Sequence, residues 1–277
     1  MKKIIVFIMA FALIAPAASA QVPQDDPDLD LSVAQPDFTI VTLPTTLRVP
    51  RFKSAFRVTH RFRRPLGAGD FGELASDLFG LDSGANIGLE YRFGLIRGTQ
   101  VGIRRTNNRT IEFFSQYNVM QQNATRPIGL GVIASVEGTN NFRNSYSPSL
   151  GVALSRIIPR LGTVYLEPIW VHDSKLQGTR RTALDALVDD NDTFMIGAGA
   201  RIRVRPTVYL VGEIIPRVAG YNPGVNHASF GMEKRAGGHA FQVNVSNGFG
   251  TTMGQLARGG FTNDDWYLGF NISRKFF

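Results

Sequence analysis

Apolar and polar residues alternate along most of the chain after residue 53. In FRVTHRF, for example, Phe56, Val58 and Phe62 alternate with Arg57 and Arg61. A period of two is typical of β-strands that have one apolar and one polar face. The pattern predicts twelve antiparallel strands, over residues 53–64, 83–95, 98–106, 109–121, 127–138, 144–158, 162–173, 193–205, 207–218, 229–236, 239–247 and 264–277.

The connections between these segments are alternately short and long. Short turns are expected at 97–98, 124–126, 160–162, 206–207 and 237–238. The other set is mostly long, at 65–82, 139–143, 174–192, 219–228 and 248–263, with only 107–108 tight. Bacterial outer-membrane barrels have short periplasmic turns and longer outer loops, and their strands need ~9–11 residues. The sequence therefore predicts an all-β fold, a transmembrane antiparallel β-barrel of about 12 strands over residues 51–277, with both chain ends in the periplasm.

The first fifty residues do not follow this pattern. Lys2 and Lys3 precede an apolar run over 4–14, and a small-residue site ends at Ala20. This is typical of a signal peptide over 1–20, cut between Ala20 and Gln21. The apolar run is also shorter than the ~20 residues of a spanning helix. Residues 21–50 are rich in Asp and Pro. They are predicted to form a solvated periplasmic tail, with folding back into the lumen or docking to a partner as the alternatives.

The polar phase of the predicted strands is rich in Arg and Glu. The residues expected to line the lumen are Arg57, Arg61, Arg63, Glu90, Arg92, Arg104, Glu112, Glu137, Glu167, Arg201, Arg203, Arg205, Glu213, Arg217, Glu233 and Arg235. Twelve strands fall between filled eight-stranded barrels and open sixteen-stranded porins. Two hypotheses therefore stand: a narrow channel that favours anions, or a lumen closed by an Arg–Glu lattice. Within such a lattice, Arg203 and Glu213 are expected to pair across the 206–207 turn.

Composition excludes several classes of protein. The chain has no Cys, which excludes disulfide scaffolds and Cys-ligated metal sites. Loss of Lys2 and Lys3 with the signal peptide lowers the formal net charge from +8 to +6, and an exported chain is not expected to bind nucleic acid. The Asp residues over 185–192 lack EF-hand spacing, so no metal ligand is predicted. No cofactor site is predicted either.

Catalytic chemistry has a single weak candidate. His172 and Ser174 resemble the His-x-Ser of outer-membrane phospholipase, itself a twelve-stranded barrel. In that motif Asn-Gly follows, whereas this chain reads HDSKLQG. A nucleophilic Ser needs a base that a third group orients. Since the orienting residue is absent, no catalytic residue is assigned, no enzyme is predicted, and a lipase is kept only as a remote alternative.

The last predicted strand, DWYLGFNISRKFF, suggests how the barrel is assembled. Its apolar phase contains Trp266, Phe270 and Phe276, and it resembles the C-terminal signal that the barrel-assembly machinery recognises. It departs from that signal at Phe277, which falls on the polar phase. The partners expected from this strand and from the barrel are the assembly machinery and outer-membrane lipid.

Three stretches resemble a known family. FRVTHRF (56–62), LFGLDSGANIGLEY (78–91) and VGIRR (101–105) are similar to a family of bacterial outer-membrane β-barrels of unknown function. The resemblance covers most of the mature chain. It implies a barrel without established catalytic residues, and its genes often lie near those of c-type cytochromes, which implies periplasmic redox partners. The sequence thus favours a narrow, porin-like transport channel, with a closed barrel that scaffolds such a partner as the alternative.

Overall fold

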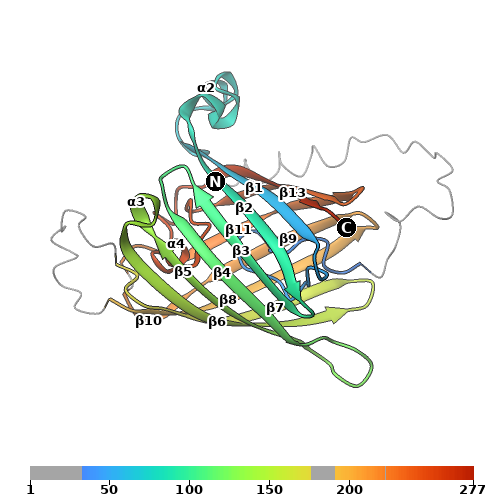
Figure 1. The fold of residues 1–277 in the computed structure, drawn as a ribbon. Coiled ribbons are helices and arrows are strands. Elements are labelled where there is room, and N and C mark those ends of the chain that lie inside the picture. The colour runs from blue at the N-terminus through green and yellow to red at the C-terminus, as the bar shows by residue number, and fades with distance from the viewer. Residues whose placement is uncertain (1–32, 176–190, 222) are drawn as a thin grey trace, which may run out of the picture.

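The computed structural model describes residues 33–175, 191–221 and 223–277, which form a closed antiparallel barrel (Figure 1). Apart from β9 and β10, each strand pairs with the strands next to it in the chain, and β1 closes the ring against β13. The strands are β1 (Ser54–Pro65), β2 (Ala85–Ile96), β3 (Thr99–Thr106), β4 (Ile111–Met120), β5 (Gly129–Gly138), β6 (Asn144–Ile158), β7 (Gly162–Val171), β8 (Thr193–Arg205), β9 (Val208–Ile215), β10 (Arg217–Gly220), β11 (His227–Ala236), β12 (His239–Ser246) and β13 (Tyr267–Lys275).

The two short strands β9 and β10 occupy one position in the ring. Both pair with β8, and only Pro216 separates them. Proline has no N–H to donate to a ladder; its carbonyl still accepts from the amide of Ile196 at 2.9 Å. The thirteen segments therefore make the twelve-stranded ring that the alternation predicts.

Strand alternation separates a polar inner face from an apolar outer face. On β4, Glu112 and Gln116 are buried within the barrel, whereas Phe113 and Tyr117 are exposed on its outside. Because successive side chains on a strand point to opposite faces, one phase of the sequence supplies the lumen and the other a belt of apolar side chains around the barrel.

The barrel has two different ends. The chain enters β1 and leaves β13 at one of them, which also carries the short β2–β3, β8–β9 and β11–β12 turns and is called here the short-turn end. The opposite, long-loop end carries helix α2 (Phe71–Ser76), the 3-10 helix η2 (Leu78–Ser83), α3 (Thr139–Phe142) and α4 (Met253–Ala257). Among the described residues, no helix is long and apolar enough to cross a membrane.

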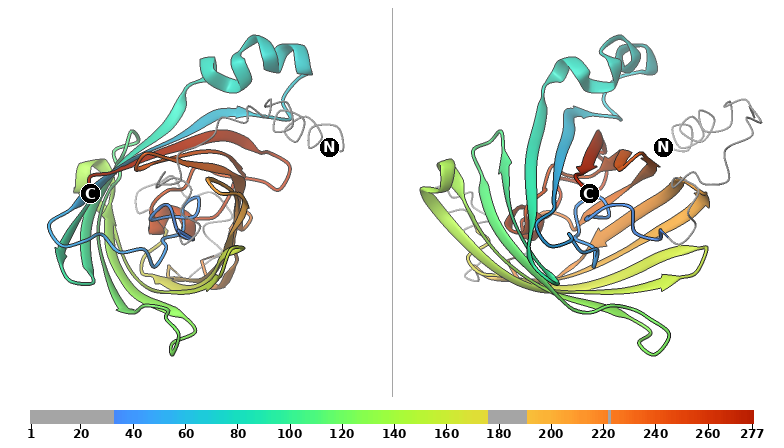
Figure 2. Two further views of the ribbon diagram at one scale, coloured as in Figure 1. Left: turned by 90° about the vertical axis from the view of Figure 1, so that its right-hand side faces the viewer. Right: turned by 45° about the vertical axis from the view of Figure 1, so that its right-hand side comes forward.

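Two segments outside the ladder lie inside the ring. Residues 33–49, before β1, enter from the short-turn end, and the loop that contains α4 folds inward from the long-loop end (Figure 2). The expectation of a solvated tail is therefore wrong for residues 33–49, and the alternative of a segment folded into the lumen holds for them. Residues 21–32 and the predicted signal peptide lie outside the described residues.

Candidate functional site: a lumen filled by two segments

Most of the side chains expected in the lumen are buried on the inner face. Arg203 and Arg235 are partly buried, and Arg63 and Arg205, close to strand ends, are exposed. The buried members of the predicted set are Arg57, Arg61, Glu90, Arg92, Arg104, Glu112, Glu137, Glu167, Arg201, Glu213, Arg217 and Glu233.

One group of ion pairs joins β2, β3 and β4. Arg104 donates from Nε to Glu90 at 2.8 Å and from Nη1 to Glu112 at 2.6 Å. Arg92 also pairs with Glu90. Neighbouring strands present these groups at matching heights, since Arg104 lies opposite both Glu90 and Glu112 in the ladder. The three strands are thus crosslinked on their inner face by charge-assisted hydrogen bonds.

A second ion pair spans β8 and β11. Arg201 contacts Glu233 twice, from Nε at 3.0 Å and from Nη2 at 3.1 Å, and both side chains are fully buried. The Nη2 contact is a hydrogen bond, whereas the Nε contact is close but lacks hydrogen-bond geometry, so one charge-assisted hydrogen bond supports this ion pair. Arg201 also donates to the carbonyl of Thr39 at 2.8 Å, so this pair holds the inserted segment as well as the wall.

The inserted segment 33–49 folds into a hairpin whose tip meets Glu213. Its arms are joined by hydrogen bonds from Ile40 to Leu43 and from Thr45 to Phe38, both 2.8 Å long. At the tip, the amides of Val41, Thr42 and Leu43 all donate to the Glu213 carboxylate, at 2.9–3.1 Å. The Thr42 hydroxyl donates to it too. The carboxylate therefore satisfies three consecutive backbone donors that the turn leaves free.

Wall side chains also bind the carbonyls of this hairpin. Gln242 donates to Ile40 at 2.7 Å, and Gln116 donates to Thr45 at 2.7 Å. Arg57 donates to the carbonyl of Val41 and lies 3.8 Å from the carboxylate of Asp37, in the inserted segment. Among the described residues, the segment forms its only bridge with itself, between Thr39 and Pro44, and pairs with no barrel strand. It is held by side chains, not by sheet extension.

The α4 loop is held by acidic wall residues at the other end. The amide of Met253 donates to Glu112 at 3.0 Å, and Thr252 donates from its hydroxyl to Glu137. Arg258, just after α4, pairs with Glu137. The sequence predicts this segment as part of an outer loop. In the structure its Met253, Leu256 and Ala257 are buried, and apolar residues in such a loop are the sequence feature that indicates an inward fold.

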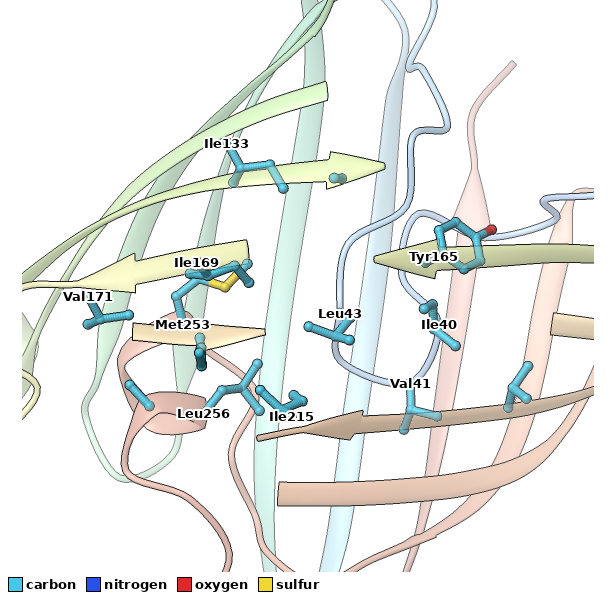
Figure 3. Packing of buried hydrophobic residues seen from close by; sticks show 14 residues of the cluster. Ile40, Val41, Leu43, Ile133, Tyr165, Ile169, Val171, Ile215, Met253 and Leu256 are labelled. Atoms are coloured by element: carbon cyan, nitrogen blue, oxygen red, sulfur yellow. The ribbon is translucent and has the colours of Figure 1, made fainter. Parts of the chain in front are cut away.

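Apolar side chains from the two inserted segments belong to one cluster in the middle of the barrel. Ile40, Val41 and Leu43 from the hairpin and Met253 and Leu256 from α4 pack there with wall residues (Figure 3). The wall contributes Ile133, Ala153, Tyr165, Ile169, Val171, Met195, Val211 and Ile215. The two inserted segments therefore meet in one apolar cluster inside the barrel.

Several buried ionisable side chains have an atom without a hydrogen-bond partner among the described residues, and Glu167 and Arg61 have two such atoms each. Neither carboxylate oxygen of Glu167 has a hydrogen-bond partner, although the side chain is fully buried. It lies between Ala153 on β6 and Gly197 on β8 by register. Arg61 donates from Nη1 to Asn271 at 2.9 Å, but its Nε and Nη2 have no partner. A buried polar group without a hydrogen-bond partner destabilises the fold. Glu167 and Arg61 are therefore expected to lower the stability of the filled lumen.

The expected pairing of Arg203 with Glu213 is wrong. Across the β8–β9 ladder Arg203 lies opposite Tyr209, and Glu213 lies opposite Gly199, four residues further along β8. Four residues of strand span ~13 Å. Arg203 instead donates to the carbonyl of Val33, while Glu213 binds the hairpin tip.

His172 and Ser174 lie at the long-loop end with separate partners. Nδ1 of His172 is 2.8 Å from Oδ1 of Asp192. The buried Ser174 donates to the carbonyl of Asn191 at 2.8 Å and contacts the hydroxyl of Thr193 at 2.7 Å. Within the described parts of the chain, no hydrogen bond joins Ser174 to His172, so the contact that would activate a serine nucleophile is not formed. The Asp residues at 185, 189 and 190 lie outside the described residues.

Solved structures of similar fold are outer-membrane porins. The NanC porin has a TM-score of 0.54 at 8% identity, covering 79% of this chain and 98% of its own. The COG4313 outer membrane channel from Pseudomonas putida F1 has a TM-score of 0.53 at 10% identity, covering 83% and 98%. The KdgM porin has a TM-score of 0.50 at 8% identity, covering 81% and 99%. At such identities the likeness concerns the fold.

The sequence itself matches a family but no functionally curated protein. The family model that matches is described as "Membrane bound beta barrel domain (DUF5777)", and the match runs over residues 37–276. It includes most of the hairpin within the lumen as well as the whole ring of strands. The chain belongs to this family of membrane-bound β-barrel domains of unknown function.

Proposed function

We propose that this protein is a bacterial outer-membrane channel. In the described structure, the channel is closed by the inserted segment 33–49 of the same chain. The observation that carries the proposal is the way residues 33–49 are held. The hairpin is bound to the wall by hydrogen bonds and apolar contacts, and it pairs with none of the described strands. Withdrawal of the hairpin would therefore leave the ladder intact. Water that enters the opened lumen would then hydrate the wall groups that the hairpin had bound.

The proposed orientation follows from the loops and the chain ends. Barrels of this class have short periplasmic turns and longer outer loops, so the short-turn end would face the periplasm. The hairpin then enters from the periplasm and α4 from outside. The two meet at the apolar centre formed by Leu43 and Leu256 with the wall.

An anion preference of the open state follows from the charges that the hairpin covers. Arg57 would lose Asp37 and the Val41 carbonyl, and Arg203 would lose the Val33 carbonyl. Glu90, Glu112 and Glu233 would remain paired with wall Arg residues. Glu213 would lose the hairpin amides, so one released carboxylate would stand against the two released guanidinium groups. A confined low-dielectric lumen amplifies such a surplus. We propose small anionic solutes as the permeating class.

Planar-bilayer conductance of two deletion variants tests the channel. One variant joins the signal sequence directly to Leu47, and the second also replaces residues 249–258 by a short Gly-Ser loop. The full chain should conduct rarely. The variants should conduct persistently, with a reversal potential on the anion side in a KCl gradient. If the double variant is folded but silent, or cation-selective, the anion-channel proposal fails.

Occupation of the lumen from both ends favours a second candidate, a closed barrel that scaffolds a partner. The acidic residues over 25–30 precede the hairpin, and in the proposed orientation they would lie in the periplasm, where they could dock a basic surface, such as that of a redox protein. The discriminating result is a silent double variant together with a protein that co-purifies with the full chain and is lost when residues 21–32 are deleted.

A further inference from the structure

A groove crosses the outer, lipid-facing surface of β2–β5. It has a volume of about 670 Å³ and is largely open to the outside of the barrel. The side chains that carry the argument are Tyr91, Ile103, Phe113, Ser115, Ala134 and Val136. Phe113 is 44% exposed.

The groove arises from the register of side-chain sizes. Val101, Ser115 and Ala134 lie side by side on β3, β4 and β5 and form its floor. The next row toward the long-loop end contains Ile103, Phe113 and Val136, and the next row toward the short-turn end contains Thr99, Tyr117 and Val132. The groove forms because the row with Ser115 and Ala134 has small side chains, whereas the rows on either side contain large ones. Its mostly apolar walls suit a hydrocarbon chain.

Arginines without acidic partners lie at the long-loop end of the same strands. Arg105 belongs to the lipid-facing phase, opposite Leu89 and Ile111. Arg109 lies in the β3–β4 turn, and Arg143 follows α3. All three, called here the rim arginines, are exposed. Within the described ranges, no carboxylate forms a salt bridge with any of them.

Two of the rim arginines, Arg105 and Arg109, are linked through Asn141, and Arg143 lies two residues further along the chain. Arg105 donates to the side chain of Asn141 at 3.2 Å, and the amide of Asn141 donates to the carbonyl of Arg109 at 2.8 Å. Phe142, next to Asn141, packs edge-on against Phe113 in the groove wall, with ring centroids 5.2 Å apart. The turn at α3 thus joins the rim arginines to the groove.

The rim arginines and the groove are close enough for one lipid molecule to contact both. From Arg105 to Val101 is four residues, or ~13 Å of strand. Half of a ~30 Å hydrocarbon core is ~15 Å, so a headgroup held at the rim can send an acyl chain into the groove. Guanidinium groups bind phosphate by charge-assisted hydrogen bonds.

We infer that this face is a binding site for a phosphate-bearing acylated lipid of the outer leaflet, with the phosphate on the rim arginines and an acyl chain in the groove. The inference rests on the outer-membrane orientation proposed above, but it does not depend on whether the lumen conducts. A lipid held this way would fix the position of the β2–β5 wall in the membrane.

Native mass spectrometry of the purified full chain in detergent tests the site. The probes are bisphosphorylated lipid A and the same lipid without its phosphates. Because each lost charge-assisted contact weakens binding, the full chain should prefer the phosphorylated probe by about tenfold or more. The combined variant Arg105→Ala, Arg109→Ala and Arg143→Ala should lose that preference. Ala134→Phe, which fills the floor, should weaken binding of both probes.

Two control variants match these changes elsewhere on the barrel. Arg156→Ala removes an exposed arginine at the short-turn end, and Ala198→Phe enlarges a lipid-facing alanine between Leu166 and Ile214. Both should bind lipid as the full chain does. The inference is overturned if the triple variant keeps its preference, if Ala134→Phe binds normally, or if equimolar inorganic phosphate displaces the lipid, which would indicate a site for free phosphate. Conductance is not part of the readout, so failure here and failure of the channel proposal are separate results.

Discussion

Glu213 on β9 and Thr42 in the inserted hairpin are joined twice, because the carboxylate accepts both the Thr42 amide, at 2.9 Å, and the Thr42 hydroxyl. This one wall side chain also binds the amides of Val41 and Leu43. Glu213 is therefore the main polar anchor of the hairpin tip.

Glu213→Ala should release the hairpin. The substitution leaves three backbone amides without an acceptor, and hydrogen bonds to a charged group contribute about 1.5–3 kcal/mol each. The chain has no native cysteine, so Thr46→Cys provides a single reporter in the buried segment. Maleimide should label this cysteine much faster in the Glu213→Ala background. Glu73→Ala, in the exposed α2, is the matched control and should leave the rate unchanged; equal rates in all three proteins would contradict the anchoring role.

The Arg201–Glu233 pair should show strong coupling. Removing either partner leaves the other charge buried and unpaired, which destabilises proteins by about 3–5 kcal/mol. Arg201→Met and Glu233→Leu should each lower the free energy of unfolding in detergent, and the double variant should recover a large part of the loss. A double-mutant cycle measures the coupling. Additive effects would mean that the two side chains do not depend on each other in the folded barrel.

Glu167→Leu should stabilise the closed state. Both oxygens of this carboxyl group are buried without hydrogen-bond partners, and such a group costs about 1–3 kcal/mol. An apolar side chain of similar size extends the cluster around Ile169 and Leu43. The expected result is a higher midpoint of thermal unfolding and slower labelling at Thr46→Cys. A lower midpoint would show that the carboxyl group makes a stabilising interaction in the membrane.

Glu137→Ala should loosen α4 without releasing the hairpin. Glu137 holds Thr252 and Arg258 on either side of this short helix. A cysteine at Leu256, buried in the central cluster, should become reactive in the Glu137→Ala background, while Thr46→Cys stays protected. If both reporters respond together, the two segments open as one unit and not independently.

The amino-acid sequence by itself determined the barrel and the faces of its strands. The period of two in β1 places Arg57 and Arg61 inward and Val58 outward, because a strand exposes successive side chains to opposite faces and an unpaired charge is costly in lipid. The same physics sorts Glu112 and Phe113 on β4. Loop lengths determined which ends of the strands lie together.

Only the tertiary structure decided what fills the lumen. The hairpin is recognised largely through backbone amides and carbonyls, as at Val41 and Leu43, and every non-proline residue carries those groups; their pattern therefore leaves no mark in the sequence. The partner of Glu213 depends in addition on the stagger of the β8–β9 ladder, which places Arg203 ~13 Å away. Alternation specifies the face to which a side chain points, but the height at which it meets a partner is set by closure of the whole ring.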